Sequence, residues 1–209
     1  MKLSIIVCVS NERKTIKKIL KKINQLRLVS PWKKEIIIVD NCSIDGTREI
    51  LSKIKRNDTK IIFQKINIGK GHSVKTALKF CTGQYVIPQD SDLEYDPSDI
   101  RKILNFALRN KHDFVVGSRA KNGKRFHKYW INEIGANFLT IVFNSLFKTN
   151  FSDVASCYKL MNLKKLKRFY MTKFNSFNFQ NFYKTHSDLD SIKLLRIMIK
   201  DIFYKKIAV

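Results

Sequence analysis

The sequence predicts a single α/β domain in which a mostly parallel β-sheet lies between helical layers. Over the first 120 residues, short runs rich in Ile and Val alternate regularly with segments of helical periodicity. Such alternation is typical of parallel strands joined by helical crossovers. The chain has 209 residues, an ordinary length for one domain with a sizeable core, and no internal repeat or linker divides it.

Five apolar runs in this first part are expected to form strands. The run at residues 35–40 is almost wholly Ile and Val, as expected for a strand covered on both faces. The segment at 14–26 carries Ile16, Ile19 and Ile23 on one helical stripe. Strands are therefore predicted at 3–9, 35–40, 60–64, 85–89 and 113–117, and helices at 14–26, 48–55, 71–80 and 97–109.

The remainder of the chain is less regular. Residues 119–129 form a basic loop, and the aromatic, Asn-rich stretch at 169–183 fits no simple pattern. The last segment has Ile192, Leu195 and Ile199 on one stripe with basic residues beside it. A helix is predicted at 131–147, a strand at 157–161 and a terminal amphipathic helix at 189–204.

Targeting signals are not expected in this chain. The first residues lead directly into a strand without a signal-peptide pattern. No run reaches the roughly 18 to 20 apolar residues needed to span a bilayer. The four cysteines lie far apart without a CxxC pair, which favours reduced thiols in a cytosolic protein, and Cys8 is interpreted as a small buried hydrophobic residue.

The strongly basic composition suits a polyanionic partner. Lys and Arg total 41 against 17 acidic residues, a formal net charge of +24. Nucleic acid, an anionic membrane surface or a phosphorylated substrate would each fit such an excess. The Lys residues are scattered along the whole chain, so solvated Lys-rich faces explain it equally well. No helix-turn-helix, zinc finger or aromatic RNA-binding signature occurs, and nucleic acid is therefore not an expected partner.

Two carboxylates, Asp90 and Asp92, stand directly after the predicted strand at 85–89. Ligands of open α/β sheets bind at the carboxyl ends of the strands. Asp-x-Asp at such an edge can hold a hard divalent cation, which can in turn hold a diphosphate. An isolated Asp-x-Asp is more often an acidic turn before a helix, so the interpretation depends on the neighbouring strand ends.

Three other strand ends also carry polar residues. Because parallel strands end at one edge of a sheet, we expect these segments to converge with Asp90 and Asp92 on one cleft. Asp40 is well placed to accept hydrogen bonds from the base or ribose of a nucleotide, and a Gly-Lys-Gly turn before a helix suits phosphate oxygens. That turn alone would be only a tight turn, and neither a P-loop nor a GxGxxG motif occurs. The segments are Ser10-Asn11-Glu12, the run from Asp40 to Thr47, and Asn67-Ile68-Gly69-Lys70-Gly71.

Six motifs in this order and spacing resemble those of the family 2 glycosyltransferases with the GT-A, Rossmann-like fold. The resemblance is nearest to the dolichyl-phosphate mannosyltransferase-like, polyprenyl-phosphate glycosyltransferase branch, and it covers about residues 3–165. The motifs are Val9-Ser10-Asn11-Glu12, the run from Val39 to Thr47, Asn67-Ile68-Gly69-Lys70-Gly71, the run from Gln89 to Pro97, Gly117-Ser118-Arg119 and Cys157-Tyr158-Lys159.

This resemblance implies an inverting hexosyltransferase that moves a sugar from a nucleoside-diphosphate sugar to a polyprenyl-phosphate or envelope-glycan acceptor, assisted by Mg²⁺ or Mn²⁺. Asp90, Asp92 and, as a further ligand, Glu94 would hold the cation. The leaving nucleoside diphosphate gains negative charge, which a divalent cation and an Arg would stabilise. The implied nucleotide-sugar contacts are Glu12, Asp40, Asn41, Lys70, Asp90, Ser91, Asp92 and Arg119.

The implied catalytic residues are Asp92, Arg119 and Asp153. Asp153 is a candidate acceptor-side acid, although a loop or capping Asp is an equally good interpretation. A polyprenyl-phosphate oxygen is already anionic and needs little help from a general base. Residues 1–165 are expected to form the GT-A domain, and 166–209 a shortened, membrane-facing acceptor segment of that domain.

The chain departs from the family pattern at several positions. Cys8 and Ser10 stand where the family usually has Pro and Tyr, and Asn41 replaces a second Asp, which leaves the nucleotide preference open. Residues 177–182 lack the acid that relatives carry in this region. The shortened acceptor side leaves a second hypothesis open, a catalytically impaired nucleotide-sugar-binding remnant or partner subunit. The helices at 134–147 and 189–204 could rest on anionic lipid at the cytoplasmic face or simply close the core; no oligomeric state is predicted.

Overall fold

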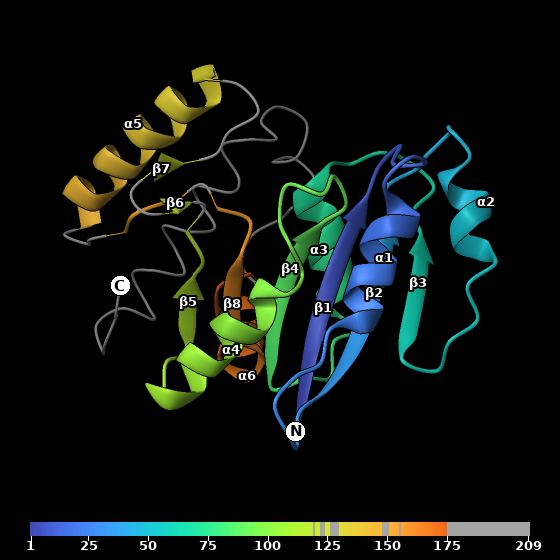
Figure 1. The fold of residues 1–209 in the computed structure, drawn as a ribbon, viewed down its shortest axis with the longest axis horizontal. Helices are drawn as coiled ribbons and strands as arrows, with labels where there is room; N and C mark the ends of the chain where they lie inside the picture. The colour runs from blue at the N-terminus through green and yellow to red at the C-terminus, as the bar shows by residue number, and fades with distance from the viewer. Residues whose placement is uncertain (119, 122–123, 126–129, 148–150, 155, 175–209) are drawn as a thin grey trace.

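The computed structural model describes residues 1–118, 120–121, 124–125, 130–147, 151–154 and 156–174 (Figure 1). Arg119, the segment at 177–182 and the predicted terminal helix at 189–204 lie outside the described residues. The expectations for them therefore stay predictions.

A six-stranded sheet with the order β3-β2-β1-β4-β8-β5 forms the centre of the molecule (Figure 1). β1 pairs in parallel with β2 and β4, and β2 with β3, while β8 runs antiparallel between β4 and β5. The predicted mostly parallel sheet is thus confirmed. The strands are β1 (Lys2–Val9), β2 (Lys33–Asp40), β3 (Thr59–Phe63), β4 (Tyr85–Asp90), β5 (Phe114–Val116) and β8 (Lys159–Asn162).

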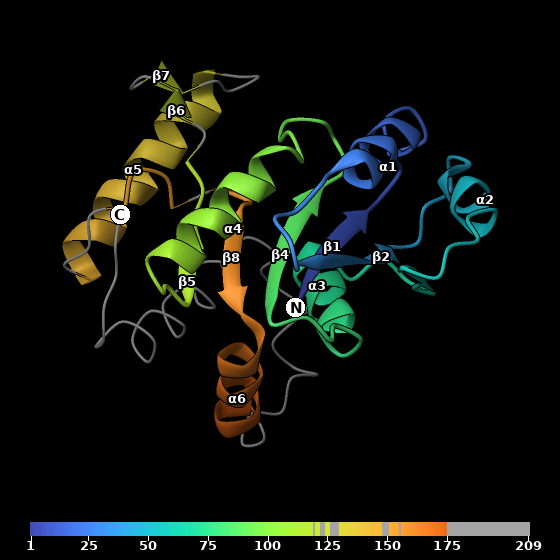
Figure 2. The same ribbon diagram turned by 60° about the horizontal axis from the view of Figure 1, so that its bottom comes forward.

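Helices cover both faces of this sheet. In Figures 1 and 2, α1 and α4 lie over one face, and α3 and α6 lie over the other. A small ribbon, β6 (Ala120–Lys121) with β7 (Lys124–Arg125), forms within the predicted basic loop and lies beside α5. The helices are α1 (Ile16–Gln25), α2 (Thr47–Ser52), α3 (Lys70–Leu78), α4 (Asp99–Arg109), α5 (Trp130–Phe147) and α6 (Leu163–Phe174).

β1 is the strand on which both halves of the core are built. Successive side chains of a strand point to opposite faces. Ile5 accordingly packs in one apolar cluster with Ile19 of α1 and Leu104 of α4, whereas Ile6 belongs to a second cluster with Leu166 of α6. All five of these side chains are at most 1% exposed. The central strand is therefore held in place from both sides.

α6 was not predicted. Its buried positions include Leu163 and Leu166, three residues apart, and Lys residues stand between and around them. A helical stripe this narrow does not stand out from a basic segment. α6 also crosses the expected boundary between residues 165 and 166. Within the described part of the chain, no helix has the length and apolarity that crossing a bilayer requires.

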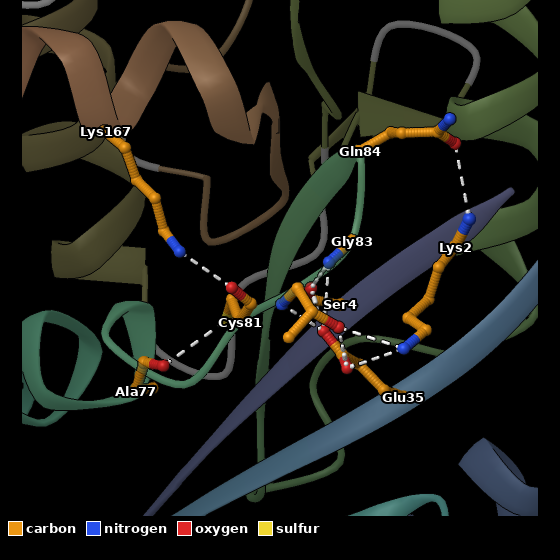
Figure 3. A network of polar contacts seen from close by, with 9 residues as sticks. Lys2, Ser4, Glu35, Ala77, Cys81, Gly83, Gln84 and Lys167 are labelled. Atoms are coloured by element: carbon orange, nitrogen blue, oxygen red, sulfur yellow. Dashed lines mark hydrogen bonds and ion pairs between the residues drawn. The ribbon is translucent and has the colours of Figure 1, made fainter.

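A partly buried carboxylate, Glu35, closes the edge of the sheet at the amino ends of the strands (Figure 3). Its Oε1 accepts hydrogen bonds from the Ser4 hydroxyl at 2.6 Å and from the Thr82 amide at 2.6 Å, and Lys2 lies 3.4 Å from Oε2. Burial raises the pKa of Glu35, but the hydrogen bonds from Ser4 and Thr82 outweigh it and hold the pKa below its ordinary value of 4.5. The turn before β4 is thereby tied to β1 and β2.

A glycine is required at position 83, next to this network, because the backbone of β1 approaches it closely. A Cβ at this position would lie 2.7 Å from the backbone nitrogen of Ser4 and 2.8 Å from the carbonyl oxygen of Lys2. Backbone atoms of a central strand cannot retreat from such a contact, so only glycine lets β4 enter the sheet here.

We expect Glu35→Gln to lower the free energy of unfolding by about 2 kcal/mol at pH 7, because hydrogen bonds to a charged acceptor are lost. The pKa of Glu35 is lowered in the folded state, so its contribution is complete above the unfolded pKa and is lost as pH falls through the folded pKa. Urea unfolding should therefore show the difference between wild type and variant narrowing below about pH 4.5. Lys2→Met, which removes a half-exposed partner, should cost less than about 1 kcal/mol. A constant difference across this pH range would contradict the assignment.

Candidate functional site

The parallel register brings the predicted polar segments to one edge of the sheet. Val9 at the end of β1 is the register partner of Asp40 at the end of β2, and Cys8 is the partner of Asp90 at the end of β4. The loops that follow are also tied together, because the Glu12 amide donates to the Thr47 hydroxyl at 2.9 Å. The convergence expected from the strand ends is present.

A cavity of about 220 Å³ opens at this edge. Six of the predicted nucleotide-sugar residues line it, and so do Cys8 and Ser73, which sequence reasoning did not assign to the site. Cys8 is only partly buried: it packs against the core cluster of Ile6, as its interpretation as a small hydrophobic residue implies, and it also takes part in the cavity wall. The lining residues are Cys8, Val9, Ser10, Glu12, Asn41, Lys70, Ser73, Asp90, Ser91 and Asp92.

Lys70 lies in ion-pair contact with Asp90 on one wall of the cavity. Its Nζ is 2.5 Å from Asp90 Oδ1 and 3.7 Å from the Cys157 sulfur. Gly69, which precedes α3, has a φ of +90° and a ψ of 167°, a backbone conformation open essentially only to glycine. This conformation starts α3 at Lys70, and the lysine side chain reaches the end of β4 from there.

The two thiols beside Lys70 are neutral. Burial raises the pKa of the Cys8 thiol to about 12 and also raises that of Cys157. Burial lowers the pKa of Lys70, but its ion pair with the Asp90 carboxylate opposes this effect, and the net shift is upward. Lys70 therefore stays protonated beside Asp90.

Asp40 is fully buried and does not line the cavity, although the next residue, Asn41, does. Arg48 donates from Nε to Asp40 Oδ2 at 2.7 Å, and the Ser43 amide donates to the same oxygen at 3.3 Å. The guanidinium also donates to the carbonyl of Gln64 and lies 5.2 Å from the centroid of the Phe63 ring. Asp40 Oδ1, by contrast, has no hydrogen-bond partner among the described residues. A buried acceptor without a hydrogen bond destabilises the folded protein unless a ligand supplies a donor.

Asn41 joins the end of β2 to the glycine turn before α3. Its side-chain nitrogen donates to Asn67 Oδ1 at 2.6 Å, and its oxygen accepts from the Ile68 amide at 3.1 Å. This pair of contacts places the turn from which Lys70 extends. Asn41 also lines the cavity, so it combines a positioning contact with access to a ligand.

The acidic turn after β4 is held from the side of the antiparallel strand. The Tyr158 hydroxyl donates to Gln89 Oε1 at 2.6 Å, the Cys157 amide donates to the Tyr95 hydroxyl at 2.9 Å, and the two tyrosine rings pack at 4.7 Å between centroids. Tyr158 is thus a supporting residue that sequence reasoning quoted only as part of a motif.

The carboxylates of this turn suit a divalent cation in donor chemistry. Asp92 is exposed and accepts from the Glu94 amide at 3.0 Å, while Glu94 itself does not line the cavity. Across the ranges that the structure describes, no three His, Cys, Asp or Glu side chains gather as a metal site. Mg²⁺ in phosphate-binding sites is typically held by one or two carboxylates together with substrate phosphates. Asp90 already binds one cation, the Lys70 ammonium. The carboxylates of Asp90 and Asp92, together with a diphosphate, would therefore suit Mg²⁺ or Mn²⁺.

Asp153 lies apart from this cavity. It is 1% exposed and borders a second cavity of about 360 Å³ between α4, β5 and the chain before β8. Apolar side chains such as Phe106 and Val116 form much of that wall, and Lys102 also contributes to it. The structure therefore separates Asp153 from Asp90 and Asp92, and its role stays a prediction.

The sequence model of the family described as "Glycosyl transferase family 2" matches residues 4–170. The chain is 29% identical over 126 residues to a protein of Pyrococcus furiosus named dolichol-phosphate mannosyltransferase. The aligned region covers 59% of this chain and 35% of that protein. It spans only about a third of that relative's length.

Solved structures share the fold. S. aureus TarS residues 1–349 superpose with a TM-score of 0.64 at 22% identity, over 94% of this chain and 55% of that one. TarS has also been solved with UDP-GlcNAc. The mannosyltransferase PcManGT of Pyrobaculum calidifontis, solved with GDP-Man and Mn²⁺, gives a TM-score of 0.60 at 18% identity, over 95% of this chain and 52% of that one.

We expect Arg48→Met to lower the free energy of unfolding by about 3 kcal/mol, because Asp40 is left as an uncompensated buried charge. Adding Asp40→Asn should then restore part of the loss, since the charge itself is removed. Urea unfolding of the single and double variants measures both effects. Arg56→Met, which breaks an exposed pair with Asp58, should cost less than about 1 kcal/mol. If Asp40→Asn further destabilised Arg48→Met, buried charge would not be the cause.

Proposed function

The chain belongs to glycosyl transferase family 2, and from this premise we propose that it transfers a sugar from a nucleoside-diphosphate sugar, with inversion, to a polyprenyl-phosphate or envelope-glycan acceptor. The observation that carries the proposal is the cavity at the carboxyl edge of the sheet. Glu12, Asn41, Lys70, Asp90, Ser91 and Asp92 share its wall, although they are scattered over 81 positions of the chain.

The nucleoside end of the donor would lie over β1 and β2. Asp40 Oδ1 is a buried acceptor that lacks a donor among the described residues, which supports a hydrogen bond from a base or ribose. Reaching it requires the ligand to enter beside Asn41. One carboxylate oxygen of Glu12 accepts a hydrogen bond from the Thr15 hydroxyl at 2.5 Å. The other carboxylate oxygen would accept from a ribose hydroxyl.

The diphosphate end would lie at β4. Asp90 and Asp92, with Glu94 as a further ligand, would hold Mg²⁺ or Mn²⁺, and this ion would neutralise charge on the leaving diphosphate. The Pyrobaculum mannosyltransferase, whose structure was solved with both GDP-Man and Mn²⁺, supports such use. Ser91 donates its hydroxyl to the Cys8 carbonyl at 3.0 Å, which fixes the turn between the two carboxylates. Arg119, which lies outside the described residues, is proposed as the second positive group at the diphosphate.

The acceptor side is proposed to face a membrane. α5 exposes Phe138 by 65% and Ile141 by 68%, with Leu139 and Val142 beside them, which supports contact with lipid at the cytoplasmic face. Asp153 would act on this side as the acceptor-side acid. A phosphate acceptor is itself anionic, so Asp153 would orient it more than deprotonate it.

Thermal unfolding with Mn²⁺ or Mg²⁺ and UDP-, GDP-, dTDP- or CDP-sugars tests the donor site. A ligand that binds only the folded state at about 100 times its Kd adds about 2.7 kcal/mol of stability. For a chain of this size, we expect the midpoint to rise by about 5 to 10 °C with one nucleotide and only when metal is present. Asp92→Asn should abolish the rise.

Asp99→Asn is the matched control, because Asp99 is a carboxylate of α4 paired with Lys102 and does not line the cavity. It should retain the full rise in midpoint. Absence of any rise in the wild type would contradict the proposed function. Donor binding without transfer to any acceptor would favour the impaired, donor-binding alternative.

A further inference from the structure

The ion pair between Lys70 and Asp90 occupies one of the two carboxylates that the proposed function assigns to the metal. The ammonium lies 2.5 Å from Asp90 Oδ1, and the Asp90 side chain is 19% exposed. Asp92 is more exposed and bonds to the Glu94 amide. The lysine therefore pairs with the less exposed of the two acids and covers its Oδ1.

We propose that Lys70 is an exchangeable internal cation: it occupies Asp90 in the donor-free protein and yields it to the divalent ion when a nucleoside diphosphate enters. This inference rests on the proposed function and specifies how its donor site is regulated. Its consequence is that metal and nucleotide bind with strong mutual dependence, and that metal alone binds weakly.

Competition for Asp90 follows from charge and space. A cation in contact with a carboxylate cancels the charge that attracts a second cation and covers the oxygen that it would take. With Asp90 occupied, the cavity offers Asp92 as its remaining aspartate. One exposed carboxylate is a poor site for Mg²⁺, which gives up its water reluctantly.

Exchange is possible because the Lys70 side chain is half-exposed while its backbone is fixed at the start of α3. The side chain is 54% exposed, and its backbone begins α3 directly after Gly69. In the part of the chain that the structure describes, Asp90 is the only carboxylate in ion-pair contact with Lys70. A diphosphate beside Asp92 would offer new anionic oxygens within the same cavity, and lysine binds phosphate well as a point charge.

The exchange makes the binding of metal and nucleotide reciprocal. If the nucleotide removes Lys70 from Asp90, it raises the affinity for metal, and metal must raise the affinity for nucleotide by the same factor. A purely structural Lys70 would stabilise the fold without producing this coupling. The coupling factor is therefore the readout that separates the two roles.

The test measures Mn²⁺ binding without nucleotide, from the electron paramagnetic resonance signal of free Mn²⁺, on wild type and Lys70→Met. A neighbouring opposite charge changes the affinity of a carboxylate for a proton by about 10- to 1,000-fold. Removing the competing ammonium should thus raise the affinity for Mn²⁺ at least about tenfold. Adding Asp90→Asn to Lys70→Met should cancel the gain. Lys79→Met, which removes the same charge at the other end of α3, should match wild type.

The second measurement is the factor by which nucleoside diphosphate strengthens Mn²⁺ binding. In Lys70→Met this factor should fall by about the same ratio by which the affinity for Mn²⁺ alone rises. Lys70→Gln provides a second, polar variant should Lys70→Met fold poorly. Equal Mn²⁺ affinity in wild type and both Lys70 variants would overturn the inference. Failure of the proposed function is distinguishable, because it would show as no nucleotide binding by wild type with Mn²⁺, whatever the Lys70 variants do with metal alone.

Discussion

The parallel register of β2, β1 and β4 is the constraint on which the rest of the molecule depends. β1 is paired on both sides, so the register that places Asp40 beside Val9 also places Asp90 beside Cys8. Apolar clusters on both faces of β1 oppose any slip, because a shift by one residue would move every side chain of the strand into the cluster on the opposite face. Loops separated by tens of residues therefore meet at one edge, and their side chains form one cavity.

Two acids at this edge carry a basic partner, and the two pairs differ in how freely the partner can leave. Asp40 is fully buried, and Arg48 is held by the Gln64 carbonyl and the Phe63 ring as well. That pair is part of the fold. Asp90 is less buried, and its partner Lys70 is a flexible, half-exposed side chain. On our proposal this second pair is the one that opens, so the nucleoside end of the site is rigid and the diphosphate end adapts.

Much of this architecture could be predicted from sequence, because strand and helix periods and strand-end residues are local signals. The convergence of Glu12, Asn41, Asp90 and Asp92 follows from such signals and from the geometry of parallel sheets. Three features do not. The insertion of antiparallel β8 between β4 and β5 depends on long-range pairing, α6 has too narrow an apolar stripe, and the Lys70–Asp90 contact depends on where a helix starts in space.

A crystal structure with Mn²⁺ and the nucleoside diphosphate that stabilises the protein tests the central claim most directly. Anomalous scattering would locate the manganese. Our account predicts the ion between the diphosphate and the carboxylates of Asp90 and Asp92, with the Lys70 ammonium moved from Asp90 onto a phosphate oxygen. A diphosphate bound away from the carboxyl edge of β1, β2 and β4, or a manganese ion bound without either aspartate, would contradict it.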